Sequence, residues 1–153
     1  MKKRLLRVFL WVLLILIVLA IQSLLSMWSI KLNLAILPIY YLSMKKGLIE
    51  GLSAGIFTGV IQDSLAGGFI GPSVLANGLS AVGISYVPEV FYYWQPLLGI
   101  SAMFLGTLFN DLVVYLCLSI FVQQPVPFSD FIYLGLGRAL INCPFGLFIS
   151  YKK

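Results

Sequence analysis

Two charged residues, Asp111 and Arg138, lie inside long apolar runs and are the side chains best placed to carry chemistry. Counted from the loop between the two runs, at 1.5 Å per helical residue, Asp111 lies about 15 Å and Arg138 about 11 Å along its run. Antiparallel neighbouring helices would therefore bring them to a similar depth. An unpaired charge inside a bilayer costs at least roughly 2.5–3.5 kcal/mol, so each charge is expected to have a partner. Two roles fit: an ion pair that fixes helix register, which we favour, or part of a path for an ion or a substrate.

The residue types that usually support catalysis or metal binding are scarce. The chain has no His, and both of its Cys residues, Cys117 and Cys143, fall within apolar runs. This composition predicts neither a disulfide framework nor a zinc site. A proton relay is also disfavoured, because Asp111 is the one acid clearly inside an apolar run. We therefore expect no catalytic residue, no metal and no cofactor, and a membrane enzyme ranks third among the functions considered.

Four glycines recur at every fourth position and define one face of a predicted helix: Gly47, Gly51, Gly55 and Gly59. Positions without a side chain let another backbone approach closely, which matters most in lipid, where helices associate by close packing. Glycine is otherwise poor in helices, so four in register require a packing reason. We favour packing within the chain, and the alternative is a docking face for a helix of another protein. Weaker rows of small or polar residues are Ser73, Asn77, Ala81 and Ser85, and then Gly135, Ala139 and Cys143.

Asp63 follows this glycine row and precedes a loop that contains Gly67 and Gly71. Asp side chains readily accept hydrogen bonds from the free N–H groups of a turn, so a surface carboxylate that holds this loop is the simpler interpretation. The alternative is a contact with a partner protein. At the other end of the same run, Glu50 lies one turn from Lys46, which predicts a local ion pair worth about a few tenths of a kcal/mol.

Six apolar runs must position these residues, in a chain of 153 residues that is 61% hydrophobic and 10% charged, with a mean hydropathy of +1.04. A soluble domain of this length has far more charge, so we predict one domain, residues 1–153, forming an all-α bundle of six transmembrane helices. The run 32–44 covers only roughly 20 Å of a hydrocarbon core about 30 Å thick, and it contains Pro38. It is predicted to be a short, kinked span, with a re-entrant segment as the alternative. The runs cover residues 8–25, 32–44, 47–65, 73–87, 97–122 and 131–151.

Most basic residues flank the runs, as in cytoplasmic segments of membrane proteins. They lie at residues 2–7, 45–46 and 152–153, which predicts that both termini are cytoplasmic and leaves Lys31 on the outer side. The run 8–25 is longer than the roughly 7–15 apolar residues of a signal peptide, so an uncleaved span is predicted. The aromatic segment 88–96 is expected in a headgroup layer. No basic stripe with interleaved aromatic residues follows the sequence, and nucleic acid is not an expected partner.

The stretch 41–47, the glycine row and the segment 62–75 together resemble MreD, the rod-shape-determining membrane protein family of bacteria. That family has a basic turn ending in Gly, a Gly-rich helix that ends in an Asp, a short Gly loop and a further helix. The segment 142–145, which begins with Asn142, resembles the last span of the family together with the apolar residues and lysines that follow it. The resemblance covers nearly the whole chain and is most specific over residues 41–80.

The resemblance implies a non-catalytic component of the bacterial cell-elongation complex, in the cytoplasmic membrane, that helps to control cell shape and peptidoglycan synthesis. MreC is the implied direct partner, and RodA with its penicillin-binding transpeptidase and the MreB cytoskeleton are further implied partners. The implied fold is that of the substrate-binding subunits of energy-coupling-factor transporters. Asp63, the glycine row and the cytoplasmic loops are the expected contacts. The chain departs from the family in its short second span and in its aromatic fourth-to-fifth loop, which has no Lys or Arg.

A small-molecule-binding subunit of a vitamin transporter is the alternative function. Six spans of this size suit such a subunit, and so does a polar pocket near Asp63, Asn77, Asp111 and Arg138. A vitamin that remains bound to the purified protein, detected by mass spectrometry, would favour this function over an interaction protein.

Overall fold

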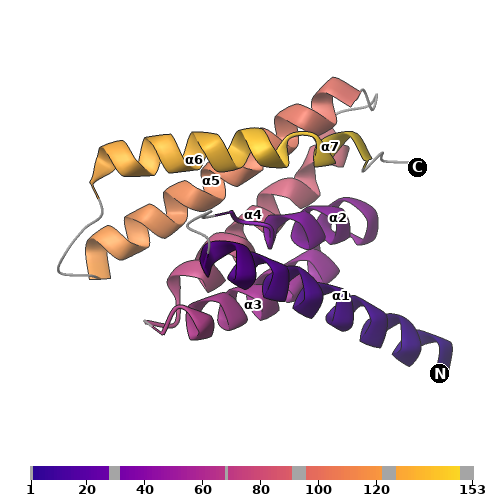
Figure 1. The fold of residues 1–153 in the computed structure, drawn as a ribbon. Helices are drawn as coiled ribbons and strands as arrows, with labels where there is room; N and C mark the ends of the chain where they lie inside the picture. The colour runs from indigo at the N-terminus through magenta and orange to yellow at the C-terminus, as the bar shows by residue number, and fades with distance from the viewer. Residues whose placement is uncertain (1, 28–31, 68, 91–95, 122–126, 149–153) are drawn as a thin grey trace.

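The computed structural model describes residues 2–27, 32–67, 69–90, 96–121 and 127–148. Within these ranges the regular structure is entirely helical, which confirms the predicted all-α class (Figure 1). The expectations for Lys31, for residues 91–95 of the aromatic segment and for the terminal lysines fall outside the described residues. The helices are α1 (Lys2–Met27), α2 (Ile36–Lys46), α3 (Leu48–Leu65), α4 (Pro72–Val90), α5 (Pro96–Phe121), α6 (Phe128–Asn142) and α7 (Phe145–Phe148).

The short helix α2 forms the centre of the bundle. On one side its Leu42 belongs to a hydrophobic cluster with Ile15 and Leu19 of α1. On the other side its Tyr40 packs in a cluster with Met103 of α5. Seven of its eleven residues are buried: Ile36, Pro38, Ile39, Tyr40, Leu42, Ser43 and Met44.

The predicted kink at Pro38 is wrong. The helix begins at Ile36 and not at residue 32, so Pro38 lies in its first turn. A first-turn residue has no intrahelical acceptor for its N–H, and proline therefore removes no hydrogen bond there. Pro38 therefore fits the first turn of this helix and does not lie in its middle, where it would bend the helix.

The glycine face of α3 is occupied from within the chain. A Cβ atom on Gly51 would collide with Ser43 of α2. On Gly55 it would lie 2.7 Å from the carbonyl oxygen of Asn77, and on Gly59 2.6 Å from the backbone nitrogen of Val74, both in α4. These contacts are the packing within the chain that the four-residue spacing of the glycines predicted. They leave these three glycines no open face for the helix of a partner.

Gly47 has a different role from the other three glycines. It connects α2 to α3 with a φ of 98°, and a Cβ atom there would meet nothing within 4 Å. Non-glycine residues rarely adopt this backbone conformation, so Gly47 allows the sharp turn between the two helices.

The last predicted run, residues 131–151, is not one helix. α6 begins earlier, at Phe128, and ends at Asn142, and the short α7 starts again at Phe145. Pro144 lies in the gap, where its missing N–H and its ring oppose a continuous helix. α7 packs against α5 so closely that a Cβ atom on Gly146 would collide with the carbonyl oxygen of Gly99. The break therefore allows α7 to pack onto α5.

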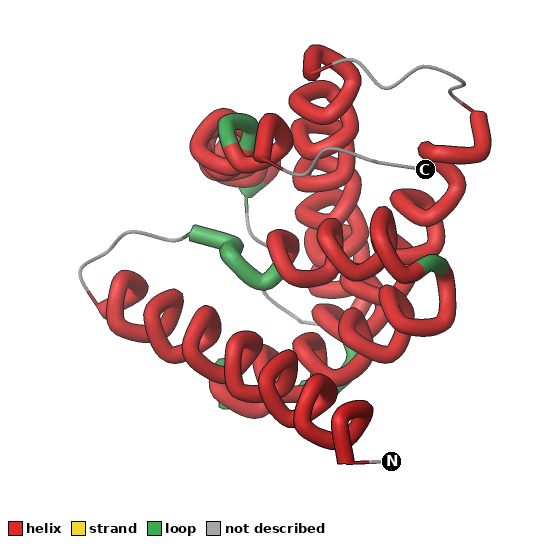
Figure 2. The backbone as a smooth tube through the Cα atoms, turned by 90° about the vertical axis from the view of Figure 1, so that its right-hand side faces the viewer, coloured by secondary structure: helices red, strands yellow, loops and turns green. Residues whose placement is uncertain are grey.

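The helices form a layered bundle. In Figure 1, α6 crosses over α5 and α1 crosses over α3, with α2 and α4 between them. The connection of residues 32–35 lies between α1 and α6 in the side view of Figure 2. This arrangement places polar residues of six segments around one central region, described below.

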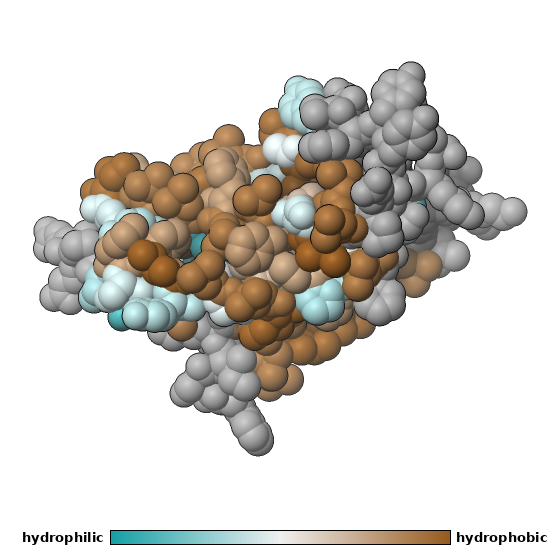
Figure 3. Space-filling view, turned by 90° about the horizontal axis from the view of Figure 1, so that it is seen from above, coloured by the Kyte–Doolittle hydropathy of each residue, from teal (hydrophilic) through white to brown (hydrophobic). Residues whose placement is uncertain are grey.

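The polarity of the molecule is inverted relative to a soluble protein. Large apolar side chains such as Phe9, Leu105 and Ile120 are more than half exposed, whereas Asn77, Asn110 and Asn142 are 0–1% exposed. Figure 3 shows one face that is mostly hydrophobic, with hydrophilic residues at its left end and a few others scattered across it. Among the described residues, Leu97–Phe121 is the one helix long and apolar enough to cross a membrane, and α1 contains a shorter apolar stretch, Phe9–Leu25.

Candidate functional site

Four side-chain amides form a closed ring of hydrogen bonds inside the bundle. Asn33 Nδ2 donates to Asn110 Oδ1 at 2.9 Å, and Asn110 Nδ2 donates to Asn77 Oδ1 at 2.8 Å. Asn77 Nδ2 donates to Gln62 Oε1 at 2.8 Å, and Gln62 Nε2 closes the ring on Asn33 Oδ1 at 3.4 Å. Each amide both donates and accepts, which is the arrangement that satisfies buried amides and lets their dipoles reinforce one another.

The ring joins segments that are distant in the sequence. Gln62 belongs to α3, Asn77 to α4 and Asn110 to α5, while Asn33 precedes α2. A slide of any one of these helices would separate an amide from its partner and leave it unpaired in an apolar surrounding. The ring therefore fixes the register of the central helices.

Further hydrogen bonds connect the ring region to α1 and α6. Asn142 Nδ2, on α6, donates to the carbonyl oxygen of Asn33 at 3.1 Å. Gln22 Oε1, on α1, accepts from the backbone N–H groups of Leu34 at 3.0 Å and Ala35 at 3.2 Å, just before α2 begins. The sequence analysis singled out Asn77 and Asn142, and the structure places both in this network.

The charged pair lies next to the ring. Arg138 Nη1 is 3.3 Å from Asp111 Oδ1, so α5 and α6 bring together the two charges that the sequence placed at similar depth. The Asp111 side chain is 4% exposed and that of Arg138 is 25% exposed. Gly135 faces the carboxylate from α6, where a Cβ atom would lie 3.7 Å from Asp111 Oδ2. A methyl group at this position would make ordinary van der Waals contact with the carboxylate.

Asp63 holds the start of α4. Its Oδ2 accepts from the backbone N–H of Gly71 at 2.7 Å, and its Oδ1 accepts from that of Ser73 at 3.0 Å. Because these N–H groups have no partner within α4, the carboxylate acts as an N-terminal cap supplied by the preceding helix. The side chain is 4% exposed, so it is not the surface carboxylate that was expected. Both oxygens are engaged, and a contact between Asp63 and a partner protein does not fit this geometry.

Gly67 and Gly71 belong to the loop that Asp63 holds. Gly67 has a φ of 65° and Gly71 a φ of 154°. A side chain would strain both positions, so the role that the structure assigns to these two glycines is the shape of the α3–α4 connection.

Two cavities adjoin the ring and the charged pair. The first has a volume of about 140 Å³ and is mostly polar. The second has a volume of about 180 Å³ and lies between α5 and α6. The first is lined by Gln22, Leu32, Asn33, Gln62, Ser73, Asn110, Asp111, Val114 and Arg138. The second is lined by Asp111, Val114, Tyr115, Leu118, Phe131, Leu134 and Arg138.

Four amides of this network were not predicted as site residues from the sequence: Asn33, Gln62, Asn110 and Gln22. The signal was available, because each of these amides lies in or beside an apolar run, where an unpaired amide would be costly. What the sequence did not contain was the pairing, which depends on how four segments align. Chemically, amides neither titrate nor attack as nucleophiles, so the ring is suited to holding helices and to binding polar groups by hydrogen bonds.

Comparison of the chain with family models, with curated proteins and with solved structures finds no match. Function is therefore inferred from the residues themselves and from the resemblance that they carry.

Proposed function

We propose that this chain is a non-catalytic, multi-pass membrane component of the bacterial cell-elongation complex, that it belongs with MreD, and that it binds MreC. One observation carries the proposal. The residues that resemble the family, from the glycine row to Gly71, form a single unit in which α3 packs on α4 and Asp63 caps α4. A motif whose parts serve one local structure is better support for a shared fold than scattered matches.

The polarity of the bundle supports a place within the bilayer. Exposed Leu, Ile and Phe side chains on α1, α3, α5 and α6 would be a liability in water and are the expected surface in lipid. At 1.5 Å per residue, α1 and α5 are about 39 Å long and α3 and α4 about 27–29 Å, against a hydrocarbon core of about 30 Å. We assign six spans, with α2 as a short buried one and α6 with α7 as the last, and both termini in the cytoplasm.

The proposed contact with MreC is the groove between α4 and α5. The groove has a volume of about 270 Å³, and only Ser80 and Ser101 among its lining residues carry polar side chains. Both hydroxyls take part in hydrogen bonds, Ser80 with Asn110 and Ser101 with the carbonyl oxygen of Leu97. Gly83 lines the groove and a Cβ atom there would meet nothing within 4 Å. A single apolar helix suits such a groove, because small residues permit close approach in lipid.

The test is co-purification in mild detergent followed by identification of the bound proteins. The account expects recovery of a protein with one membrane span and a periplasmic domain, as MreC has. Gly83→Leu should reduce this recovery several-fold because it fills the groove, whereas Gly137→Leu should not. Gly137 is a matched control on α6, since a Cβ atom there also meets nothing within 4 Å. Failure to recover such a protein, or equal recovery with both variants, would count against the proposal.

The vitamin-binding alternative has less support from the cavities. Their volumes of about 140 Å³ and about 180 Å³ are below the roughly 300–1,000 Å³ of pockets that enclose drug-sized ligands. Asp63 and Asn77, which were expected to line such a pocket, are engaged in the α4 cap and the amide ring.

A further inference from the structure

The polar cavity, with its volume of about 140 Å³, lies at one end of the bundle. Among its lining residues, Gln22 lies near the end of α1, Gln62 near the end of α3 and Ser73 in the first turn of α4. At 1.5 Å per residue, each of the three is within about 8 Å of its helix end. Because α3 begins next to Lys46 and ends at the cavity, the cavity lies on the outer side in the proposed topology.

The amide of Gln22 has unused donors. Its Oε1 accepts from the backbone N–H groups of Leu34 at 3.0 Å and Ala35 at 3.2 Å, and these two bonds identify the oxygen end of the amide. Its Nε2 carries two N–H groups and donates to no group in the described part of the chain. Gln22 is half-buried and lines the polar cavity, so its N–H groups are accessible to a molecule bound there.

Two further lining residues supply donors. Ser73 binds Asp63 through its backbone N–H, and its hydroxyl makes no hydrogen bond to the residues that the structure describes. Gln62 Nε2 makes a single long hydrogen bond, 3.4 Å to Asn33 Oδ1, which leaves its second N–H unused. Ser73 and Gln62 are both half-buried. Amide N–H groups can only donate, so a molecule that satisfies this wall must bring acceptor oxygens.

The charges around the cavity decide between a neutral and an anionic molecule. Asp111 and Arg138 line the cavity and form a pair of opposite charges. Asp63 adds a second carboxylate, whose Oδ1 is 3.0 Å from the backbone nitrogen of Ser73. The surroundings therefore carry two negative charges and one positive charge, so an anion would be repelled.

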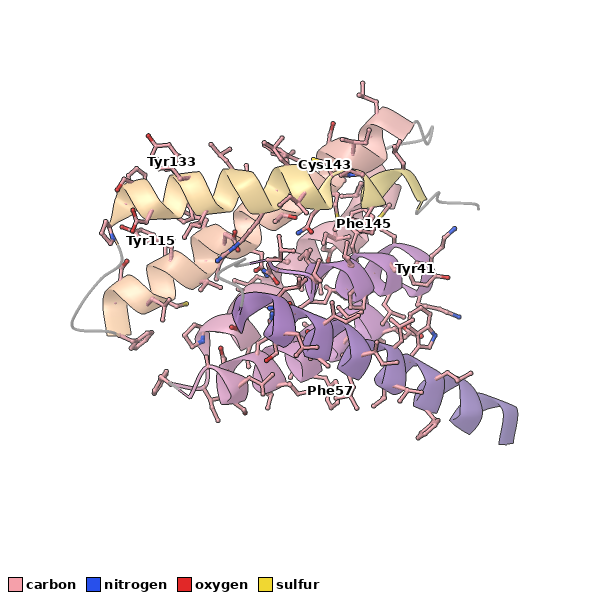
Figure 4. All side chains as sticks on the ribbon, in the orientation of Figure 1. Tyr41, Phe57, Tyr115, Tyr133, Cys143 and Phe145 are labelled. Carbon is pink, nitrogen blue, oxygen red and sulfur yellow. The ribbon has the colours of Figure 1, made fainter. Side chains whose placement is uncertain are left out.

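The neighbouring cavity has a different character. Apolar and aromatic side chains form most of its wall, among them Phe131 and Leu134. Tyr115 also lines it, and Figure 4 shows this residue between α5 and α6, on the opposite side of α6 from Tyr133. A small polar molecule is therefore expected in the polar cavity and not in its neighbour.

We propose that the polar cavity binds a small neutral molecule that presents carbonyl or hydroxyl oxygens, such as a primary amide or a polyol. Its oxygens accept hydrogen bonds from Gln22 Nε2, from Gln62 Nε2 and from the Ser73 hydroxyl. The cavity has room for roughly four or five waters at about 30 Å³ each, which suits a molecule of several non-hydrogen atoms and not a nucleotide.

The test is fluorine NMR of the full-length protein in mild detergent, with trifluoroacetamide or trifluoroacetate as the probe. The two probes are similar in size, and only the amide is neutral. The proposal expects the amide signal to broaden about threefold more than the acetate signal, because the carboxylates around the cavity repel the anion. An excess of acetamide should reverse this broadening. Equal broadening of both probes, or broadening no greater than in protein-free micelles, would overturn the proposal; the second result would mean that water alone fills the cavity.

Gln22→Glu tests the amide donors without removing the acceptor. A carboxylate at this position can still accept from the backbone N–H groups of Leu34 and Ala35, but it lacks the two amide N–H groups. The variant should keep the elution profile of the wild type and lose the broadening that the amide probe shows. Unchanged broadening in the folded variant would contradict the proposed site.

Ser73→Ala is a second, uncharged variant. It removes the hydroxyl and keeps the backbone N–H that binds Asp63, so it should reduce the broadening several-fold. Ser64→Ala is the matched control, because the Ser64 hydroxyl is exposed on α3 and bonds to the carbonyl oxygen of Val60. Equal broadening with both serine variants would count against the site. The site shares no lining residue with the α4–α5 groove, so loss of MreC binding with retained probe binding would count against the proposed function alone.

Discussion

Asn110 Nδ2 donates a 2.8 Å hydrogen bond to Asn77 Oδ1, and this bond joins α5 to α4 at the centre of the bundle. Both side chains are 1% exposed. In water such a pair would gain little, because each amide could bond to solvent instead. Inside an apolar bundle the pair and its ring determine which residues of the two helices lie opposite each other.

Asn110→Leu should destabilise the bundle, since it leaves Asn33 Nδ2 and Asn77 Oδ1 without their ring partners. Hydrogen bonds between membrane helices contribute about 0.6 kcal/mol on average, and buried unpaired groups cost about 1–3 kcal/mol, so we expect a loss of about 1–3 kcal/mol. This loss of stability is measured as the fraction of protein that stays monodisperse after heating in detergent. Ser101→Ala, at an exposed position on α5, is the control and should behave as the wild type. Equal stability of both variants would show that the ring is not required.

Gly55→Ala should separate α3 from α4. The added methyl group would lie 2.7 Å from the Asn77 carbonyl oxygen, so the helices must shift, at a cost of about 1–3 kcal/mol. Gly55→Leu should be worse. Gly137→Ala, where the methyl group meets nothing within 4 Å, should be neutral or stabilising by about 0.5–1 kcal/mol. Thermal stability in detergent distinguishes these outcomes, and a tolerated Gly55→Leu would refute the close approach.

Asp63→Ala should remove the cap of α4 and lower stability by about 0.5–2 kcal/mol. Asp63→Asn keeps one acceptor oxygen and should lie between the wild type and the Ala variant. Hydrogen exchange at the first turn of α4 reports the loss directly. If Asp63→Ala left exchange unchanged yet abolished partner binding, Asp63 would be a partner contact after all.

Removing one charge of the Asp111–Arg138 pair should be more harmful than removing both. Asp111→Asn or Arg138→Gln leaves an uncompensated charge, and breaking a buried pair in this way costs about 3–5 kcal/mol. The double variant removes that charge and should recover most of the stability. A double-mutant cycle of thermal stability measures the coupling. Additive losses would mean that the two charges do not stabilise each other.

The sequence was sufficient for the features that depend on residues close together in the chain. The period of the glycine row defined a face, and the position of Asp63 before a Gly loop indicated a turn acceptor. The similar depth of Asp111 and Arg138 in their runs also predicted their contact, because neighbouring antiparallel helices place residues of equal depth opposite each other.

The features that the sequence did not predict depend on alignment between distant segments. The amide ring requires Asn33 and Asn110 to meet across 77 positions, and no local pattern encodes that pairing. The break at Pro144 was not predicted because the apolar run continues across it. The helix ends there because proline lacks an N–H and its ring opposes a continuous helix. The position of α2 in the core was also not predicted. The short apolar run indicated a short or re-entrant span and gave no sign that the helix would be buried.

The proposed place in the bilayer requires contact between the apolar outer surface and lipid, and spin labels measure that contact. Labels would be placed at Leu105, Leu116 and Ile120 of α5, which are 64%, 49% and 74% exposed, after replacement of Cys117 and Cys143, in protein reconstituted into vesicles. At all three positions, oxygen dissolved in the bilayer should reach the label readily, and a water-soluble nickel chelate should not. Labels that the chelate reaches at all three positions would contradict the proposed place in the bilayer.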